Sequence, residues 1–130
     1  MIQDIIRRAI FYENRGYSEQ AFNEYRKLIG FEQQLPLEVL SRMVNFFYSM
    51  KQFELAFSLA KLAIEQGGEL EQHGYIYLES WKRKDHQSLQ ELEWLLFQPG
   101  INYRHKLNME IAKQLYELGE YDKSYFLSIK

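Results

Sequence analysis

The sequence contains no cysteine, no threonine, and only two prolines and two valines. The absence of cysteine excludes disulfide bonds, thiolate zinc sites and a cysteine nucleophile. The scarcity of β-branched residues other than isoleucine argues against β-strands. Because proline interrupts helices, two prolines in 130 residues leave long stretches of the chain available for helix.

Membrane and targeting signals are also missing. No stretch of the chain approaches the roughly 18 uninterrupted apolar residues that a membrane-spanning helix needs. The N-terminal segment is interrupted by Asp4, Arg7 and Arg8, so it lacks the apolar centre of a secretion signal. We therefore expect a cytoplasmic protein that has no membrane partner.

Neither sign of charge dominates. The chain has 16 Lys and Arg against 18 Asp and Glu, which gives a net charge of −2. A protein that binds nucleic acid by neutralising phosphates is usually basic, so this balance argues against a general nucleic-acid binder. A length of 130 residues is typical of one domain, which we assign to residues 1–130.

Residues that carry catalysis or hold metals do not occur in the patterns that such sites need. No two of His73, His86 and His105 have the spacing of three or four residues that places two ligands on one helix face. Gly67 and Gly68 do not form a phosphate-binding loop, and no serine stands in the setting of a hydrolase nucleophile. We expect no enzymatic activity, no cofactor and no metal.

The chain is instead rich in aromatic residues, with 10 Tyr, 9 Phe and 2 Trp. Its apolar residues recur with helical spacing, as Leu55, Leu59 and Leu62 do. The pattern predicts an all-α protein of roughly eight helices whose short connections favour antiparallel neighbours. The expected helices cover residues 2–14, 18–29, 36–49, 52–66, 69–83, 86–97, 102–117 and 121–129.

Several expected helix ends have a local cause. Pro36 suits the first turn of a helix, where the missing backbone N–H is no loss. Asp85 is expected to cap the helix that begins near His86. Gly67 and Gly68 follow an apolar run and predict a left-handed C-terminal cap.

Residues of similar character recur along the chain at intervals of 33 to 35 residues. One series is Ala9, Val44, Tyr77 and Ala112, and a second series, twelve residues later each time, is Ala21, Ala56, Leu89 and Ser124. A small residue on each of two helices lets their backbones approach, and large rings fill the remaining volume. The pair Tyr77 and Leu89 departs from this plan, so the third repeat is irregular.

The segments GYSEQAFNEYRKLI (16–29), FFYSMKQFELAFSLAKLAIEQG (46–67) and IAKQLYELGEYDKSY (111–125) carry the repeat most clearly. They resemble the tetratricopeptide repeat (TPR), a helix–turn–helix unit of about 34 residues. The resemblance implies an α-solenoid of about four stacked repeats, because a single repeat cannot bury its apolar face. The alternative is a non-repetitive helical bundle in which the spacing is accidental.

The TPR resemblance also implies a concave groove lined by the first helix of each repeat. The partner-binding candidates on the stripe expected to face this groove are Asn45, Tyr48, Leu78, Trp81, Lys113 and Tyr116. Three of them are aromatic and would form a ladder of binding anchors, while Asn45 would pair with the backbone of a bound peptide. The alternative is that the rings fill the core between repeats.

We therefore expect a protein-interaction scaffold or adaptor, in a narrower form a chaperone, that binds a peptide or helix of another protein. Two alternatives remain. One is an RNA-binding solenoid similar to the pentatricopeptide repeats, and the other is a regulatory domain of a larger enzyme assembly. Tyr121, Tyr125 and Phe126 are expected at an uncovered C-terminal end, where a second subunit would form a homo-oligomer unless that end is simply frayed.

Overall fold

The computed structural model describes residues 1–119, which form seven α-helices and two short 3₁₀ turns and contain no β-strand. The prediction of an all-α protein is confirmed for these residues. The expected helix 121–129 lies outside the described range, as do Tyr121, Ser124, Tyr125 and Phe126. The helices are α1 (Ile2–Asn14), α2 (Ser18–Arg26), α3 (Leu37–Ser49), α4 (Phe53–Glu65), α5 (Leu70–Arg83), α6 (Leu89–Leu96) and α7 (His105–Glu117).

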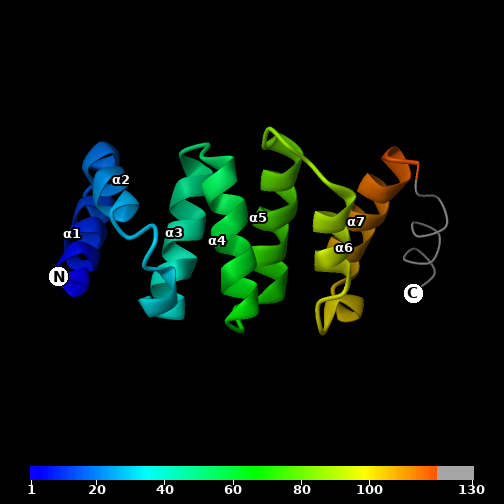
Figure 1. Cartoon of the computed structure of the whole chain (residues 1–130), viewed down its shortest axis with the longest axis horizontal. Helices are drawn as coiled ribbons and strands as arrows, with labels where there is room; N and C mark the ends of the chain where they lie inside the picture. The colour runs from blue at the N-terminus through cyan, green and yellow to red at the C-terminus, as the bar shows by residue number, and fades with distance from the viewer. Residues whose placement is uncertain (120–130) are drawn as a thin grey trace.

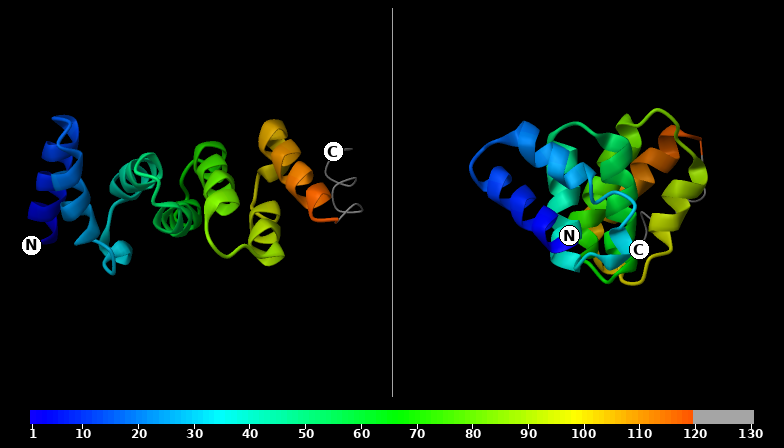
Figure 2. Two further views of the ribbon diagram at one scale, coloured as in Figure 1. Left: turned by 90° about the horizontal axis from the view of Figure 1, so that it is seen from above. Right: turned by 60° about the vertical axis from the view of Figure 1, so that its left-hand side comes forward.

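The seven helices lie in a row, with α1 at one end and α7 near the other (Figure 1). Helices that are consecutive in the chain pack together, most extensively α1 with α2, α3 with α4, and α4 with α5. Helices α3, α5 and α7 lie on one side of the row, and α4 and α6 lie on the other side (Figure 2). Helix α5 therefore also packs against both α3 and α7.

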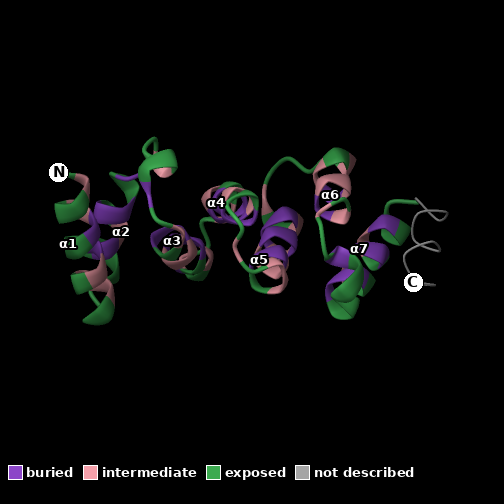
Figure 3. Ribbon diagram, turned by 90° about the horizontal axis from the view of Figure 1, so that it is seen from below, coloured by how far each residue is buried: buried purple, intermediate pink, exposed green. Residues whose placement is uncertain are grey.

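The buried faces of the helices point toward their neighbours in the row (Figure 3). The recurring residues of the sequence pattern lie in this core, namely Ala9, Val44, Tyr77, Ala112, Ala21 and Ala56. Small side chains on both members of a pair allow α1 to pack closely with α2 and α3 with α4. Leu89, which departs from the sequence pattern, is only half-buried.

Five connections between the described helices contain a residue with positive φ, and in three of them this residue directly follows the C-cap of a helix. Gly16 (φ 79°) follows α1, Lys51 (φ 61°) follows α3, and Gly67 (φ 90°) follows α4. In each turn the next residue donates its N–H to a carbonyl of the preceding helix at 2.8–2.9 Å, which satisfies one of the last helical carbonyls. The cap predicted at Gly67 and Gly68 is confirmed.

Replacing Lys51 by glycine is expected to stabilise the protein by about 0.5–1 kcal/mol, because glycine adopts a left-handed backbone without steric cost. The thermal midpoint should rise by about 2–5 °C, as measured by circular dichroism. Lys51→Ala is the matched control, since it keeps the unfavourable φ of 61° and should bring no gain. A lower midpoint for Lys51→Gly than for the wild type would contradict the expectation.

The start of α6 differs from the prediction. The helix begins at Leu89 rather than near His86, and its cap is Ser88 rather than Asp85. Ser88 Oγ accepts the N–H of Glu91 at 3.3 Å, and the Glu91 carboxylate accepts the N–H of Ser88 at 3.0 Å. The expectation for Asp85 is wrong because this reciprocal capping box fixes the helix start three residues later.

Two further boundaries are shifted by tight turns. Helix α2 ends at Arg26 rather than at residue 29, and α7 begins at His105 rather than at residue 102. After α2, the N–H groups of Leu28 and Ile29 bond to carbonyls three residues back at 3.0 and 3.1 Å. Before α7, Ile101–Tyr103 forms a 3₁₀ turn. Apolar periodicity does not distinguish such turns from the end of an α-helix.

Aromatic rings and an ion pair join the first helix pair to α3. The ring centroids of Tyr25 on α2 and Phe46 on α3 are 5.0 Å apart. The Tyr25 hydroxyl donates to Glu13 Oε1 at 2.5 Å, and Arg42 of α3 donates to the same oxygen at 2.9 Å. Burial, together with the bond to Glu13, raises the pKa of Tyr25 above its ordinary value of 10.0. The hydroxyl therefore remains a donor at neutral pH.

Close contacts also link α3, α5 and α7. Ser41 Oγ and His73 Nε2 form a hydrogen bond of 2.9 Å between α3 and α5. A side chain at Gly74 would place its Cβ 2.6 Å from Leu107 Cδ2 on α7. Leu107 is fully buried, so a larger residue at position 74 would force it to move. Glycine thus permits the close approach of α5 and α7.

Candidate interaction surface

The six predicted partner-binding residues differ in their accessibility. Asn45, Lys113 and Tyr116 are exposed, Tyr48 is half-buried, and Leu78 and Trp81 are buried. A ligand can reach the first four without any rearrangement of the fold. The partner-binding role of all six stays a prediction.

Trp81 is buried where α5 turns toward α6. Its side chain is 3% exposed, and its indole N–H donates to the carbonyl of Ser88 at 3.2 Å. Leu78, one turn earlier, has no exposed surface. Gly74, one turn earlier again, lies against Leu107 of α7. On α5, the stripe expected to line a groove is therefore part of the hydrophobic core.

Three side chains from three different helices meet at Tyr48. Tyr48 of α3 and Phe53 of α4 contact edge to face, with ring centroids 5.8 Å apart. The guanidinium carbon of Arg83, at the end of α5, lies 5.7 Å from the Phe53 ring centroid. We refer to Tyr48, Phe53 and Arg83 as the Tyr48 cluster. Sequence reasoning missed Phe53 and Arg83 as partners of Tyr48, because they belong to other helices.

Arg83 is held in this cluster by Glu79, one helical turn earlier. Arg83 donates to Glu79 Oε2 at 2.7 Å, and Lys82 donates to Glu79 Oε1 at 3.1 Å. Burial alone would raise the pKa of Glu79, but the hydrogen bonds from Arg83 and Lys82 outweigh it and keep the pKa below 4.5. Glu79 is therefore ionised at neutral pH and restrains the guanidinium beside the Phe53 ring.

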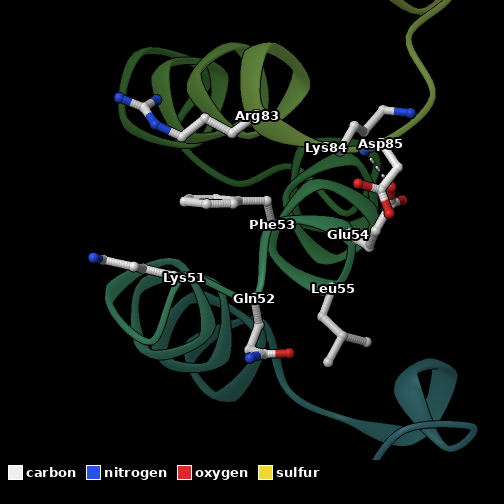
Figure 4. A pocket seen from close by; sticks show the side chains of 8 residues that line it. All are labelled: Lys51, Gln52, Phe53, Glu54, Leu55, Arg83, Lys84 and Asp85. Atoms are coloured by element: carbon white, nitrogen blue, oxygen red, sulfur yellow. Dashed lines mark hydrogen bonds between the residues drawn. The ribbon is translucent and has the colours of Figure 1, made fainter.

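A cleft of about 210 Å³ opens beside the Tyr48 cluster, between the turn after α3 and the end of α5. Phe53 extends between Lys51 and Arg83 on one side of this cleft, and Glu54 and Asp85 lie together on the other side (Figure 4). The backbone N–H of Asp85 donates to the Glu54 carboxylate at 3.2 Å. One side of the cleft is thus aromatic and basic, and the other side is acidic.

Asn45 lies on α3, just under one turn before Tyr48. Its side-chain N–H donates to the carbonyl of Ser41 at 2.9 Å. Its amide oxygen makes no hydrogen bond to any of residues 1–119. An exposed amide oxygen in this position can accept a backbone N–H from a bound chain.

The remaining accessible candidates lie on α7. Lys113 is exposed, Tyr116 is 60% exposed, and Met109 is 69% exposed. Their spacing of four and three residues places them on one face of the helix. Met and Tyr are enriched in interaction surfaces, whereas Lys is depleted there, so Met109 and Tyr116 are the residues of this face suited to binding.

Within residues 1–119 no group of three His, Asp or Glu side chains could hold a metal ion. No helix in this range is long and apolar enough to cross a membrane. The Tyr48 cluster offers two rings and a permanent cation, which are groups suited to binding.

No protein-family model, no curated protein and no solved structure matches the chain. Its function is therefore inferred from the helix contacts, the Tyr48 cluster and the exposed helix faces.

Proposed function

We propose that the chain is a TPR-like solenoid in which α1–α2, α3–α4 and α5–α6 are successive repeats and α7 begins a fourth. Left-handed residues at equivalent turns support this proposal, since Gly16, Lys51 and Gly119 all have positive φ. The third repeat lacks such a residue, because the backbone at Lys84 is extended after α5. This difference agrees with the irregularity of the third repeat in the sequence.

Contacts between successive first helices are the second support for a solenoid. Glu13 of α1 pairs with Arg42 of α3 at 2.9 Å. Ser41 of α3 bonds to a side chain of α5, and Lys82 of α5 lies 3.6 Å from the Glu110 carboxylate of α7. In a stack of helix pairs, each repeat contacts its neighbours in this way.

We further propose that the protein is an interaction scaffold that binds a segment of another protein at the Tyr48 cluster and the adjacent Asn45. The observation that carries this proposal is the convergence of two partly exposed rings and a restrained guanidinium from three helices. Tyrosine and arginine dominate the energetics of many interfaces. Because Glu79 already orders Arg83, binding would lose less conformational entropy there.

In this proposal a side chain of the partner packs against the exposed surface of Tyr48 and Phe53. Arg83 then lies close enough to contact a carbonyl or carboxylate of the same segment. The amide oxygen of Asn45, which has no hydrogen-bond partner among residues 1–119, accepts a backbone N–H and sets the direction of the bound chain. Leu78 and Trp81 contribute by supporting α5 from within the core.

Affinity capture from source lysate tests the function. The wild type should retain a protein that a Tyr48→Ala/Arg83→Ala variant loses. A Gln3→Ala/Glu19→Ala variant, altered at exposed positions of α1 and α2, should retain it. Circular dichroism must show unchanged helicity in both variants. Equal capture by all three proteins would contradict the proposed site, and capture that disappears after ribonuclease treatment would favour the RNA-binding alternative.

A further inference from the structure

Two clefts open between successive second helices, on the side of the row that carries α4 and α6. The first has a volume of about 420 Å³ and is lined by Phe22, Arg26 and Ile29 from the α2 segment and by Gln52 and Leu55 from the α4 segment. The second has a volume of about 370 Å³, and its lining includes residues of α4 and α6. We refer to them as the α2–α4 cleft and the α4–α6 cleft.

The two clefts repeat the same arrangement of residue types. Phe22 and Arg26 line the α2–α4 cleft, and Phe57 and Lys61, 35 residues later, line the α4–α6 cleft. The segments are AFNEYR (21–26) and AFSLAK (56–61). An aromatic ring and a cation one turn later therefore recur at the interval of the sequence repeat. Two unrelated surface hollows would not be expected to share this plan.

Each cleft contains a cation beside an aromatic ring. The Arg26 guanidinium lies 5.7 Å from the Phe22 ring centroid, and Lys61 Nζ lies 5.3 Å from the Trp94 ring centroid. Neither Arg26 nor Lys61 forms an ion pair with any of residues 1–119. Each cation is therefore available to a carboxylate from outside the chain.

Carboxylates near the clefts do not neutralise these cations. No acidic side chain lines the α2–α4 cleft. Glu91 lines the α4–α6 cleft, but its carboxylate lies 3.0 Å from Lys84 Nζ and also accepts the N–H of Ser88. Lys84, whose Nζ also lies 4.7 Å from the Phe57 ring centroid, thus neutralises Glu91 and leaves Lys61 as the cation that lines this cleft. Each cleft thus joins apolar walls to one cation that has no ion-pair partner in the described part of the chain.

We propose that these two clefts together bind an acidic segment of a partner protein that carries two bulky apolar side chains. One apolar side chain enters each cleft, and neighbouring carboxylates pair with Arg26 and Lys61. Each contact alone is weak, but joining the two in one chain raises the affinity through effective concentration. This site goes beyond the Tyr48 cluster, because none of Tyr48, Phe53 and Arg83 lines either cleft, although Gln52 and Leu55 line both the α2–α4 cleft and the cleft beside that cluster.

The burial of the rings favours a peptide over RNA as the occupant. Base stacking requires an open ring face, whereas Phe57 is 7% exposed and Tyr77, in the same cleft, is 1% exposed. A flexible aliphatic or aromatic side chain can instead pack against the edges of the half-buried rings, Phe22 in one cleft and Trp94 in the other.

A random-peptide library displayed on phage and selected on the full chain tests the proposal. The selected peptides should combine Asp or Glu with two bulky apolar residues. Fluorescence anisotropy with a labelled selected peptide should show binding that weakens about tenfold or more in Arg26→Glu/Lys61→Glu. The milder Arg26→Gln/Lys61→Gln should weaken it less, and it is used if the first variant is misfolded. Lys106→Glu, at an exposed position of α7, is the control and should bind as the wild type does.

Other results would overturn this inference. The inference is contradicted if no peptide is enriched, or if the selected peptides lack acidic residues. It is also contradicted if the charge reversals leave the affinity unchanged. Binding of a single-stranded RNA oligomer in place of peptides would contradict it as well. A peptide released by Tyr48→Ala but not by the reversals binds at the Tyr48 cluster. That result would overturn the two-cleft site and leave the proposed function standing.

Discussion

Replacing Trp81 by alanine is expected to lower the free energy of unfolding by about 3–5 kcal/mol, because the change removes a large ring from a packed core. The side chain is 3% exposed, and its indole N–H supplies the hydrogen bond to the Ser88 carbonyl. Loss of that donor adds to the cost of the cavity. Urea denaturation followed by circular dichroism would measure the change.

Tyr116→Ala is the matched control for this experiment. Tyr116 belongs to the same predicted stripe but is 60% exposed, so its truncation should cost less than about 1 kcal/mol. The comparison separates a core ring from an accessible ring. If Trp81→Ala kept full stability and instead weakened partner binding, Trp81 would be reachable by a ligand, and the predicted ladder of aromatic anchors would regain support.

Replacing Ala56 by glutamate is expected to cost about 3–5 kcal/mol, since it puts a charged side chain where no space or partner exists. Ala56 has no exposed surface and lies in the first turn of α4, which packs against α3 and α5. The thermal midpoint should fall by about 10 °C or more. Differential scanning calorimetry would measure the shift.

Ser58→Glu provides the control on the same helix. Ser58 is exposed, so a glutamate there should change the midpoint by no more than about 2 °C. A large loss at Ser58 would indicate a general effect of negative charge on α4 rather than burial. Wild-type stability of Ala56→Glu would contradict the packing of the helix pairs, and with it the equivalence of Ala21 and Ala56.

The sequence predicted most of the helices because the features that indicate a helix lie within the helical segment or directly beside it. Apolar spacing and turn glycines are local features, and they placed α1, α3, α4 and α5 within a residue at each end. The start of α6 was misplaced because Asp85 and Ser88 are both common capping residues. The deciding feature, Glu91 three residues after Ser88, was also local and was present in the sequence.

The candidate site was less predictable because it depends on contacts between distant segments. Trp81 is buried where the chain returns toward α6 and Ser88 accepts its indole N–H, a contact that the helical spacing of α5 does not reveal. Phe53 and Arg83 join Tyr48 only when three helices converge. The recurrence of Phe and a cation in the two clefts was visible in the sequence, but its meaning required knowing that α4 lies between α2 and α6.

The arrangement of the helices in a row affects which parts of the protein unfold locally. Among residues 1–119 the extensive contacts join helices that are adjacent in the chain or next but one, so the detachment of an end helix removes contacts mainly from its neighbours. Helix α4 is covered by both α3 and α5, whereas α1 and α2 are attached from one side only. Amide hydrogen exchange should therefore be slowest in α4 and faster in α1, because the terminal pair can detach while the middle stays folded. We therefore expect unfolding to be coupled more strongly between helices that are neighbours in the row than between helices at opposite ends of it.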